Sequence, residues 1–466
     1  MQNYQRVRIT AKLKTCSYLH IGSGEEDIFD NTQNKTASVI KTTAKTPQLY
    51  IPASTLRGFL FAKGNQQKNG ISREQIEKLF GFSNENTRQM GCCRFSNAFD
   101  TNNLTLEKRH GIELNPKTRL VERHKLYSYE VVPAGAKFEF NLEMDACSDA
   151  EIKTLCQLIA YWDGAERSAL GFKRGQGLGK IKIENLAIKT LSEKSILEWL
   201  EKDDDLDNYF EDYTLPVQQA PKKNVFTCKL HATAPIIVLD ASKTTGNQLI
   251  CHQTPDNKGL IPGTSLKGLL KGHCRKILLT ILNQIFNVRI EIAEECVNKY
   301  LAPIFGTEEF AGFIQVSEAI SSEPLSINKR PMIAIDRFSG GVKGGGEKNE
   351  KREEKAQGAL LEILAANNEL WDMTIHTHET VAAPEGNGWK GLLLLTLRDA
   401  MEGDLSIGFG KSRGFGSFRI EPEFKETYSN WDELMPELQK HYLLKDWIQA
   451  LHNELIASAQ KIKEAS

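Results

Sequence analysis

Apolar and polar residues alternate at the start of each half of the chain. The two alternating stretches are VRITAKLKTCSYLHIG at residues 7–22 and VFTCKLHATAPIIVLD at residues 225–240. Successive side chains of a strand point to opposite faces, so this alternation predicts a strand with one buried face in each half. Residues 264–282 carry apolar residues at helical spacing instead, including Leu266 and Leu270, and this spacing predicts a helix.

Each half also closes on a short strand-like stretch. KIKI occupies residues 180–183 and SFRI occupies residues 417–420. The last stretch of the chain, residues 431–465, has the periodicity of a helix. Strands that flank helices in this order predict an α+β fold, repeated twice and followed by a C-terminal helical appendix.

Three motifs recur in the same order in the two halves. They are IPASTLRG (51–58) and IPGTSLKG (261–268), KLFG (78–81) and PIFG (303–306), and LGFKRGQGLGKIKI (170–183) and IGFGKSRGFGSFRI (407–420). Between the halves, residues 200–224 pass from an acidic run to a polar stretch with prolines, as is typical of a surface connection. We therefore predict a first domain at 1–199, a linker at 200–224, a second domain at 225–425 and a C-terminal extension at 426–466.

The composition narrows the class of protein. The chain has 466 residues, a formal net charge of -1 and no long uninterrupted apolar run, so we expect a cytoplasmic protein that does not enter a membrane. The nine cysteines are scattered without metal-ligand spacing, which excludes a zinc knuckle. A sequence pI near 6.8 is too low for a generic basic nucleic-acid binder.

Charge is nevertheless segregated locally. Residues 51–64, 170–183, 261–277 and 407–420 together hold 13 lysines and arginines and no acidic residue. Closely spaced glycines let backbone N–H groups approach a ligand, which favours anions such as phosphate. Glycine-rich turns before strands are also common structural devices, and neither segment has the spacing of a nucleotide-binding fingerprint. Because two basic motifs without acidic residues recur in both halves, we predict a polyanionic ligand that binds along both halves.

These motifs resemble the RAMP superfamily of CRISPR proteins, over about residues 5–185 and 225–420. The segments at 119–140 and 330–345 are similar to the thumb hairpin of type III backbone subunits. The resemblance implies an α+β fold of two tandem ferredoxin-like (RRM-type) domains with thumb insertions. It also implies a natural fusion of two backbone subunits, as in a type III-D-like complex.

The resemblance implies a role in antiviral defence. The chain would bind crRNA, hold complementary target RNA and assemble with other type III effector subunits. The residues expected to contact RNA, mainly through phosphates, are Ser54, Thr55, Arg57, Lys173, Arg174, Lys180, Thr264, Ser265, Lys267, Lys271, Lys411 and Arg413. Thumb residues would separate guide from target at intervals.

Backbone subunits of this type also cleave target RNA, as metal-dependent endoribonucleases. Their catalytic aspartate lies in the loop that leads to the segment corresponding to IPASTLRG or IPGTSLKG, which we call the IP motifs. The candidates are Asp30 or Asp27 in the first half and Asp240 in the second, with Asp30 and Asp240 as ligands of Mg²⁺ or another divalent cation. In each half a short strand, SVIK (38–41) or QLIC (248–251), would follow this loop. Two alternatives stay open, a noncatalytic crRNA scaffold and a guide-processing RAMP endoribonuclease.

Overall fold

The computed structural model describes two compact units. It covers residues 3–465 except 27–35, 44–45, 67–69, 84–87, 115–120, 165–167, 203–204, 215–224, 241, 245–246, 308, 336, 339–359, 379–380 and 424–440. Unit 1 contains residues 1–108, 127–174 and 178–222. Unit 2 contains residues 223–466 together with 109–126 and 175–177. No helix in the described part of the chain is long and apolar enough to span a membrane.

The main sheet of unit 1 is built around β1 (Asn3–Thr15), which pairs antiparallel with its neighbours on both sides. The strand order is β13-β12-β1-β11-β8-β4, and β7 also pairs with β11. The other strands are β4 (Tyr50–Ile51), β7 (Cys93–Phe95), β8 (Ala98–Asp100), β11 (Lys137–Ser148), β12 (Ile181–Leu191) and β13 (Glu211–Asp212). The alternation predicted for residues 7–22 is therefore a strand up to Thr15.

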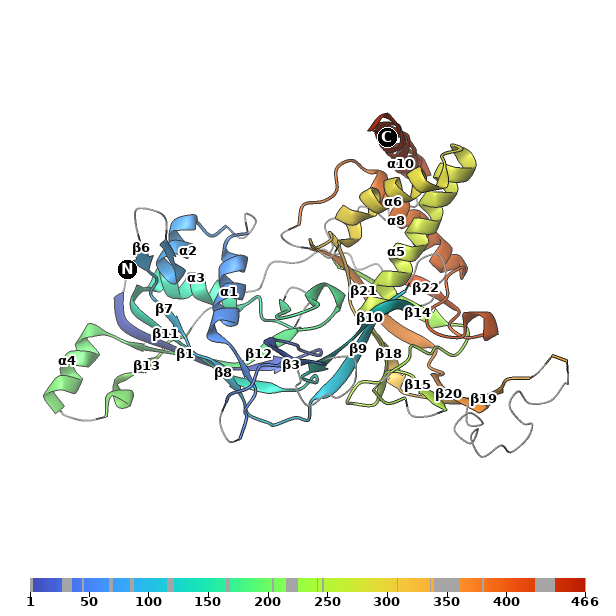
Figure 1. Cartoon of the computed structure of the whole chain (residues 1–466). Coiled ribbons are helices and arrows are strands. Elements are labelled where there is room, and N and C mark those ends of the chain that lie inside the picture. The colour runs from blue at the N-terminus through green and yellow to red at the C-terminus, as the bar shows by residue number, and fades with distance from the viewer. Residues whose placement is uncertain are drawn as a thin grey trace. The chain divides into compact units, whose positions relative to one another are not determined.

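Helices cover one face of this sheet (Figure 1). They are α1 (Ala53–Gly64), α2 (Arg73–Phe80) and α3 (Asp149–Ile159). The alternation of β1 places Val7, Ile9 and Leu13 fully inside the core, where they pack with apolar residues of the three helices. Ser72 starts α2 with a capping box, in which its hydroxyl accepts from the Gln75 N–H and the Gln75 side chain accepts from the Ser72 N–H. At the start of α3 the Glu151 carboxylate accepts from the N–H and the hydroxyl of Ser148.

Unit 2 repeats the same arrangement. Its central strand β14 (Val225–Ala232) lies in a sheet of order β16-β18-β21-β14-β22, with β17 paired to β21. The partner strands are β16 (Lys258–Ile261), β17 (Ile314–Val316), β18 (Ala319–Pro324), β21 (Leu370–Thr377) and β22 (Phe418–Glu423). The helices are α5 (Gly263–Thr280), α6 (Ile290–Phe305), α8 (Gly388–Glu402) and α10 (His441–Ala465).

Smaller sheets repeat the correspondence between the halves. In the sheet β2-β3-β10-β9, β3 (Thr36–Val39) runs parallel to β10 (Val121–Val131). In the sheet β15-β20-β19, β15 (Gln248–Ile250) runs parallel to β20 (Leu360–Ala366). The remaining strands are β2 (Gly22–Glu26), β5 (Gly81–Ser83), β6 (Arg88–Met90), β9 (Glu107–Leu114) and β19 (Ile327–Ile333). The predicted α+β class, with two tandem ferredoxin-like domains and a helical C-terminus, is confirmed.

Part of the segment expected as a linker belongs to the sheet of unit 1. After α4 (Glu193–Lys202), a short 3-10 turn at Leu206–Tyr209 leads into β13, which extends the sheet at β12. Arg8 forms an ion pair with Asp207, and Tyr213 donates a hydrogen bond to Asp149. Asp207 of the acidic run thus has a cationic partner on unit 1, and the Tyr213 hydroxyl has a carboxylate partner on α3, which residue composition alone did not indicate.

Candidate nucleic-acid interface

The two glycine motifs form loops that are anchored by the same backbone hydrogen bonds. In unit 1 the Phe172 N–H donates to the carbonyl of His20 (2.9 Å), and the Gly179 N–H donates to the carbonyl of Tyr18 (2.6 Å). In unit 2 the Phe409 N–H donates to Ile237 (2.8 Å), and the Gly416 N–H donates to Pro235 (2.9 Å). Each loop is therefore fixed to the segment that follows the central strand of its sheet.

A further bond closes each loop at its base. The Leu170 N–H donates to the Gly179 carbonyl (2.8 Å), and the Ile407 N–H donates to the Gly416 carbonyl (2.9 Å). Gly179 and Gly416 have φ angles of 81° and 78°. A Cβ on either glycine would overlap the carbonyl oxygen of Leu170 or Ile407. Glycine is required at these two positions by both the backbone conformation and the close approach.

Cationic side chains project from both loops. Arg174, Lys411 and Arg413 are exposed, whereas Lys173 and Lys180 are half-buried. In unit 2 the Arg413 guanidinium lies 3.8 Å from the sulfur of Met332 on β19. Four of the five cations predicted from the two motifs thus lie within the closed loops, and Lys180 directly follows the first of them.

The hydroxyls of both IP motifs lie within a helix. Pro52 and Pro262 are the N-cap residues of α1 and α5, because the φ fixed by the proline ring leads directly into a helix. Ser54, Thr55, Thr264 and Ser265 therefore lie in the first helical turn, and no side chain of the cap residue bonds the backbone. Neither first turn contains an acidic residue, so the positive end of each helix dipole attracts anions.

The cations on these two helices differ in their surroundings. The Arg57 guanidinium donates to the carbonyl of Phe80 (2.6 Å), and the Lys271 ammonium lies 3.4 Å from the carbonyl of Gly306. Lys267 is half-buried. Burial, with a smaller contribution from the charge of Lys271, lowers the pKa of Lys267 to about 8. An anion bound there would relieve the cost of holding this ammonium away from water.

Asp240 is buried, with 5% of its surface exposed. Its carboxylate accepts hydrogen bonds from the backbone N–H (3.1 Å) and the hydroxyl (2.6 Å) of Ser242, and it lies 3.5 Å from Nδ1 of His252. Burial raises the pKa of Asp240, but the bonds from His252 and Ser242 outweigh this effect and leave the pKa well below its ordinary value. The carboxylate therefore holds a turn.

The surroundings of Asp240 do not fit a hydrated Mg²⁺ ion, which keeps several waters and needs open carboxylate oxygens. The metal role of Asp240 stays a prediction that mutation can test. Asp27 and Asp30, the candidates in the first half, lie outside the described residues.

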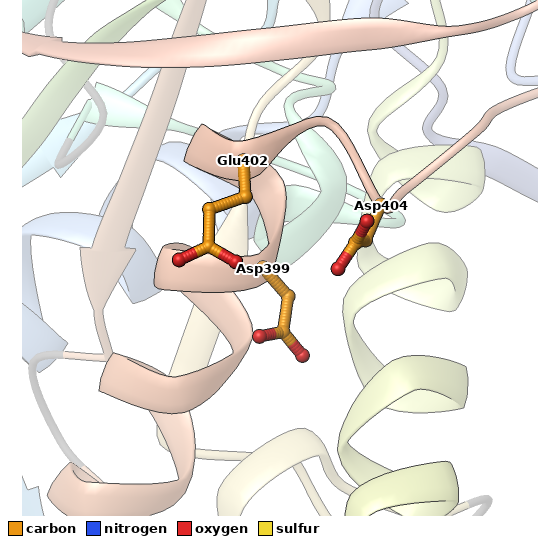
Figure 2. A group of neighbouring side chains, drawn as sticks. All are labelled: Asp399, Glu402 and Asp404. Carbon is orange, nitrogen blue, oxygen red and sulfur yellow. The ribbon is translucent and has the colours of Figure 1, made fainter.

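Among the residues that the structure describes, one cluster of three acidic side chains has carboxylate oxygens close enough together to hold a cation. Asp399, Glu402 and Asp404 lie together at the end of α8 (Figure 2). Asp399 is already paired with Nε2 of His273 (2.7 Å) and with the Arg398 guanidinium (2.9 Å), which also lies 3.8 Å from Glu402. Both oxygens of Asp399 already have partners in His273 and Arg398, so we do not assign a metal to this group.

Sequence reasoning missed an aromatic cluster beside the first glycine loop. The Lys173 ammonium lies 4.6 Å from the ring centroid of Tyr127, 4.4 Å from that of Tyr129 and 5.3 Å from that of Phe172. Tyr127 and Tyr129 are two residues apart on β10, so they share a face of the strand. That spacing was the only local signal, and it did not show which loop the rings meet.

Both halves of the chain match one known protein family. None of the curated proteins compared matches its sequence. A family model described as the RAMP superfamily matches residues 12–182 and again residues 229–419. Each match runs from the central strand of one half to the strand that follows its glycine loop. On these two matches, which cover most of the sequence, the chain belongs to the RAMP superfamily.

Proposed function

We propose that this chain is a crRNA-binding backbone subunit of a type III CRISPR effector complex, in which it holds guide and target RNA beside other effector subunits. The family match indicates a CRISPR-associated RNA-binding subunit. The observation that carries the finer proposal is the duplicated loop. The same cation-bearing glycine turn is anchored by the same three backbone bonds in both units.

The chemistry of both loops favours the RNA backbone over the bases. Exposed Arg174, Lys411 and Arg413 supply charge, while the first turns of α1 and α5 supply hydroxyls and a positive helix dipole. Contacts of this kind position a nucleic acid without reading its sequence. A subunit that must accept any guide needs such contacts.

Exposed apolar residues support a role for the second thumb region. Ile333 is 52% exposed, Ile335 is 64% exposed, and the Phe338 side chain is fully exposed. Apolar side chains inserted between bases unstack them and bend the strand. We assign these residues to separating a base of the guide from its target.

We propose that target cleavage by this chain depends on Asp27 or Asp30 of the first half and on Mg²⁺ or another divalent cation, which would stabilise charge on the cleaved phosphate. The buried, hydrogen-bonded state of Asp240 favours a noncatalytic second half. On this proposal the second half contributes binding and spacing rather than a cut.

The experiment measures binding of a single-stranded RNA to the full chain as a function of salt. Each phosphate contact contributes roughly 0.7 to the slope of log K against log salt on a single strand. We expect Lys411→Ala with Arg413→Ala to lower both the affinity and this slope, by roughly 1.4 if each cation contacts one phosphate.

The matched control is Arg73→Ala with Lys194→Ala. It removes two cations whose side chains are each 88% exposed, one on α2 and one on α4. It removes the same charge and should leave the slope nearly unchanged. Equal effects of the two double variants would contradict the assignment of phosphate contacts to the glycine loop.

A further inference from the structure

The aromatic cluster of unit 1 combines a buried base with exposed rings. Tyr129 and His20 are 4% and 5% exposed, and their rings meet edge to face at 5.7 Å between centroids. Phe172 packs edge-on against both of them, yet it is 47% exposed. Tyr127 stacks on Tyr129 at 6.1 Å and is 42% exposed. Two partly exposed rings, those of Phe172 and Tyr127, therefore stand on a buried aromatic base.

A cation is fixed beside these rings. The Lys173 ammonium donates to the hydroxyl of Tyr127 (2.7 Å) and lies 3.4 Å from that of Tyr129. Lys173 has a φ of 53°, a left-handed conformation that costs a non-glycine residue free energy. Its counterpart in the second loop is Gly410, with a φ of 73°. The first half thus keeps a lysine at a position where glycine is the residue without strain.

The described part of the second half does not repeat the rest of the cluster. Ile237 stands where His20 stands, because both accept the equivalent loop hydrogen bond. Phe409, the counterpart of Phe172, packs against the core of unit 2. Among the residues that the structure describes, the cluster of partly exposed rings around Lys173 therefore occurs beside the first loop and is not repeated beside the second, so the shared fold of the two halves does not explain it.

We propose that Phe172 and Tyr127 form a stacking site for unpaired bases of RNA, with Lys173 placed to contact the adjacent phosphate. Every base presents a flat face, so aromatic stacking binds single-stranded RNA without sequence preference. The cluster adjoins a loop that carries exposed Arg174, so a strand held there by its backbone has bases within reach of the rings. This inference rests on the proposed RNA-binding function and adds base contact to it.

The test uses the full chain and a single-stranded RNA that carries the fluorescent base 2-aminopurine at successive positions. Phe172→Leu keeps an apolar side chain but removes the flat ring, whereas Phe172→Trp keeps a stacking face. We expect Phe172→Leu to weaken binding about tenfold with an unchanged salt slope, and to lose fluorescence quenching at one position. Phe172→Trp should bind within about twofold of the unmodified protein and quench at that same position.

A strand with an abasic site at the quenched position gives a second measurement. The unmodified protein should bind it about tenfold more weakly, whereas Phe172→Leu should bind the normal and abasic strands equally. The stacking site is wrong if Phe172→Leu binds and quenches like the unmodified protein, or if this variant alters only assembly with another protein subunit. Absence of RNA binding by the unmodified protein would instead refute the proposed function itself.

Discussion

Replacing Gly416 by alanine should open the second glycine loop. Gly416 has a φ of 78°, and an added Cβ would overlap the carbonyl oxygen of Ile407. The overlap can be relieved only by moving the two segments apart. That movement breaks the bond from the Ile407 N–H to Gly416 and the bond from the Gly416 N–H to Pro235.

The size of the effect follows from these contacts. A left-handed conformation costs an alanine about 1 kcal/mol or somewhat more. Each lost hydrogen bond costs about 1 kcal/mol. We therefore expect Gly416→Ala to lower the free energy of unfolding of unit 2 by about 3 kcal/mol, which corresponds to about 6–12 °C in the melting temperature of a unit of this size.

Gly414→Ala is the matched control. Gly414 has a φ of 79°, but a Cβ there meets no atom within 4 Å. This variant has the conformational strain without the overlap, so it should lower the melting temperature by only about 2–4 °C. Gly179→Ala, the equivalent of Gly416 in unit 1, should destabilise unit 1 to a similar extent.

Scanning calorimetry of the full chain measures these shifts, and the salt slope of RNA binding reports on the loop. Gly416→Ala should lower the slope because Lys411 and Arg413 lose their fixed positions, whereas Gly414→Ala should keep it. Equal melting temperatures for the two variants would refute the reasoning, since they would show that the bonds at Gly416 do not hold the loop.

Two further predictions concern charge and cleavage. The pKa of Lys267 is lowered to about 8, so RNA affinity should fall up to about tenfold between pH 7 and pH 9 as this ammonium deprotonates. Lys267→Arg should remove most of that fall, and a fall of the same size in the variant would exclude Lys267 as its source. The folding stability of the free protein should change in the opposite direction and rise with pH. The free-energy cost of the buried Lys267 charge is fully present below pH 8 and fades as the pH rises above it. In the assembled complex with complementary RNA, Asp27→Ala or Asp30→Ala should abolish a metal-dependent cut that EDTA also abolishes, whereas Asp240→Asn should lower the melting temperature of unit 2 and leave that cut in place. Loss of a cut in Asp240→Asn, with stability unchanged, would restore Asp240 as a catalytic residue.

Features written into neighbouring residues were predictable from the sequence. The alternation at residues 225–240 and the spacing at 264–282 predicted β14 and α5, because periodicity records which face of an element is buried. Recurrence of the IP and glycine motifs predicted the duplicated fold, since the same local turns were needed twice. The resemblance that these motifs carry led to the family that the comparison then showed.

What only the tertiary structure decided depends on residues far apart in the chain. The Asp240 carboxylate is committed to Ser242 and His252, and the Lys173 ammonium is held by rings more than 40 residues away on β10. The carbonyls of Tyr18 and Pro235 anchor loops that follow them by over 150 residues. Local sequence determines which conformation a segment favours, but burial and hydrogen-bond partners are set only when distant segments pack together. Burial and hydrogen-bond partners lower the pKa of Asp240, and the packing around Phe172 leaves its ring partly exposed.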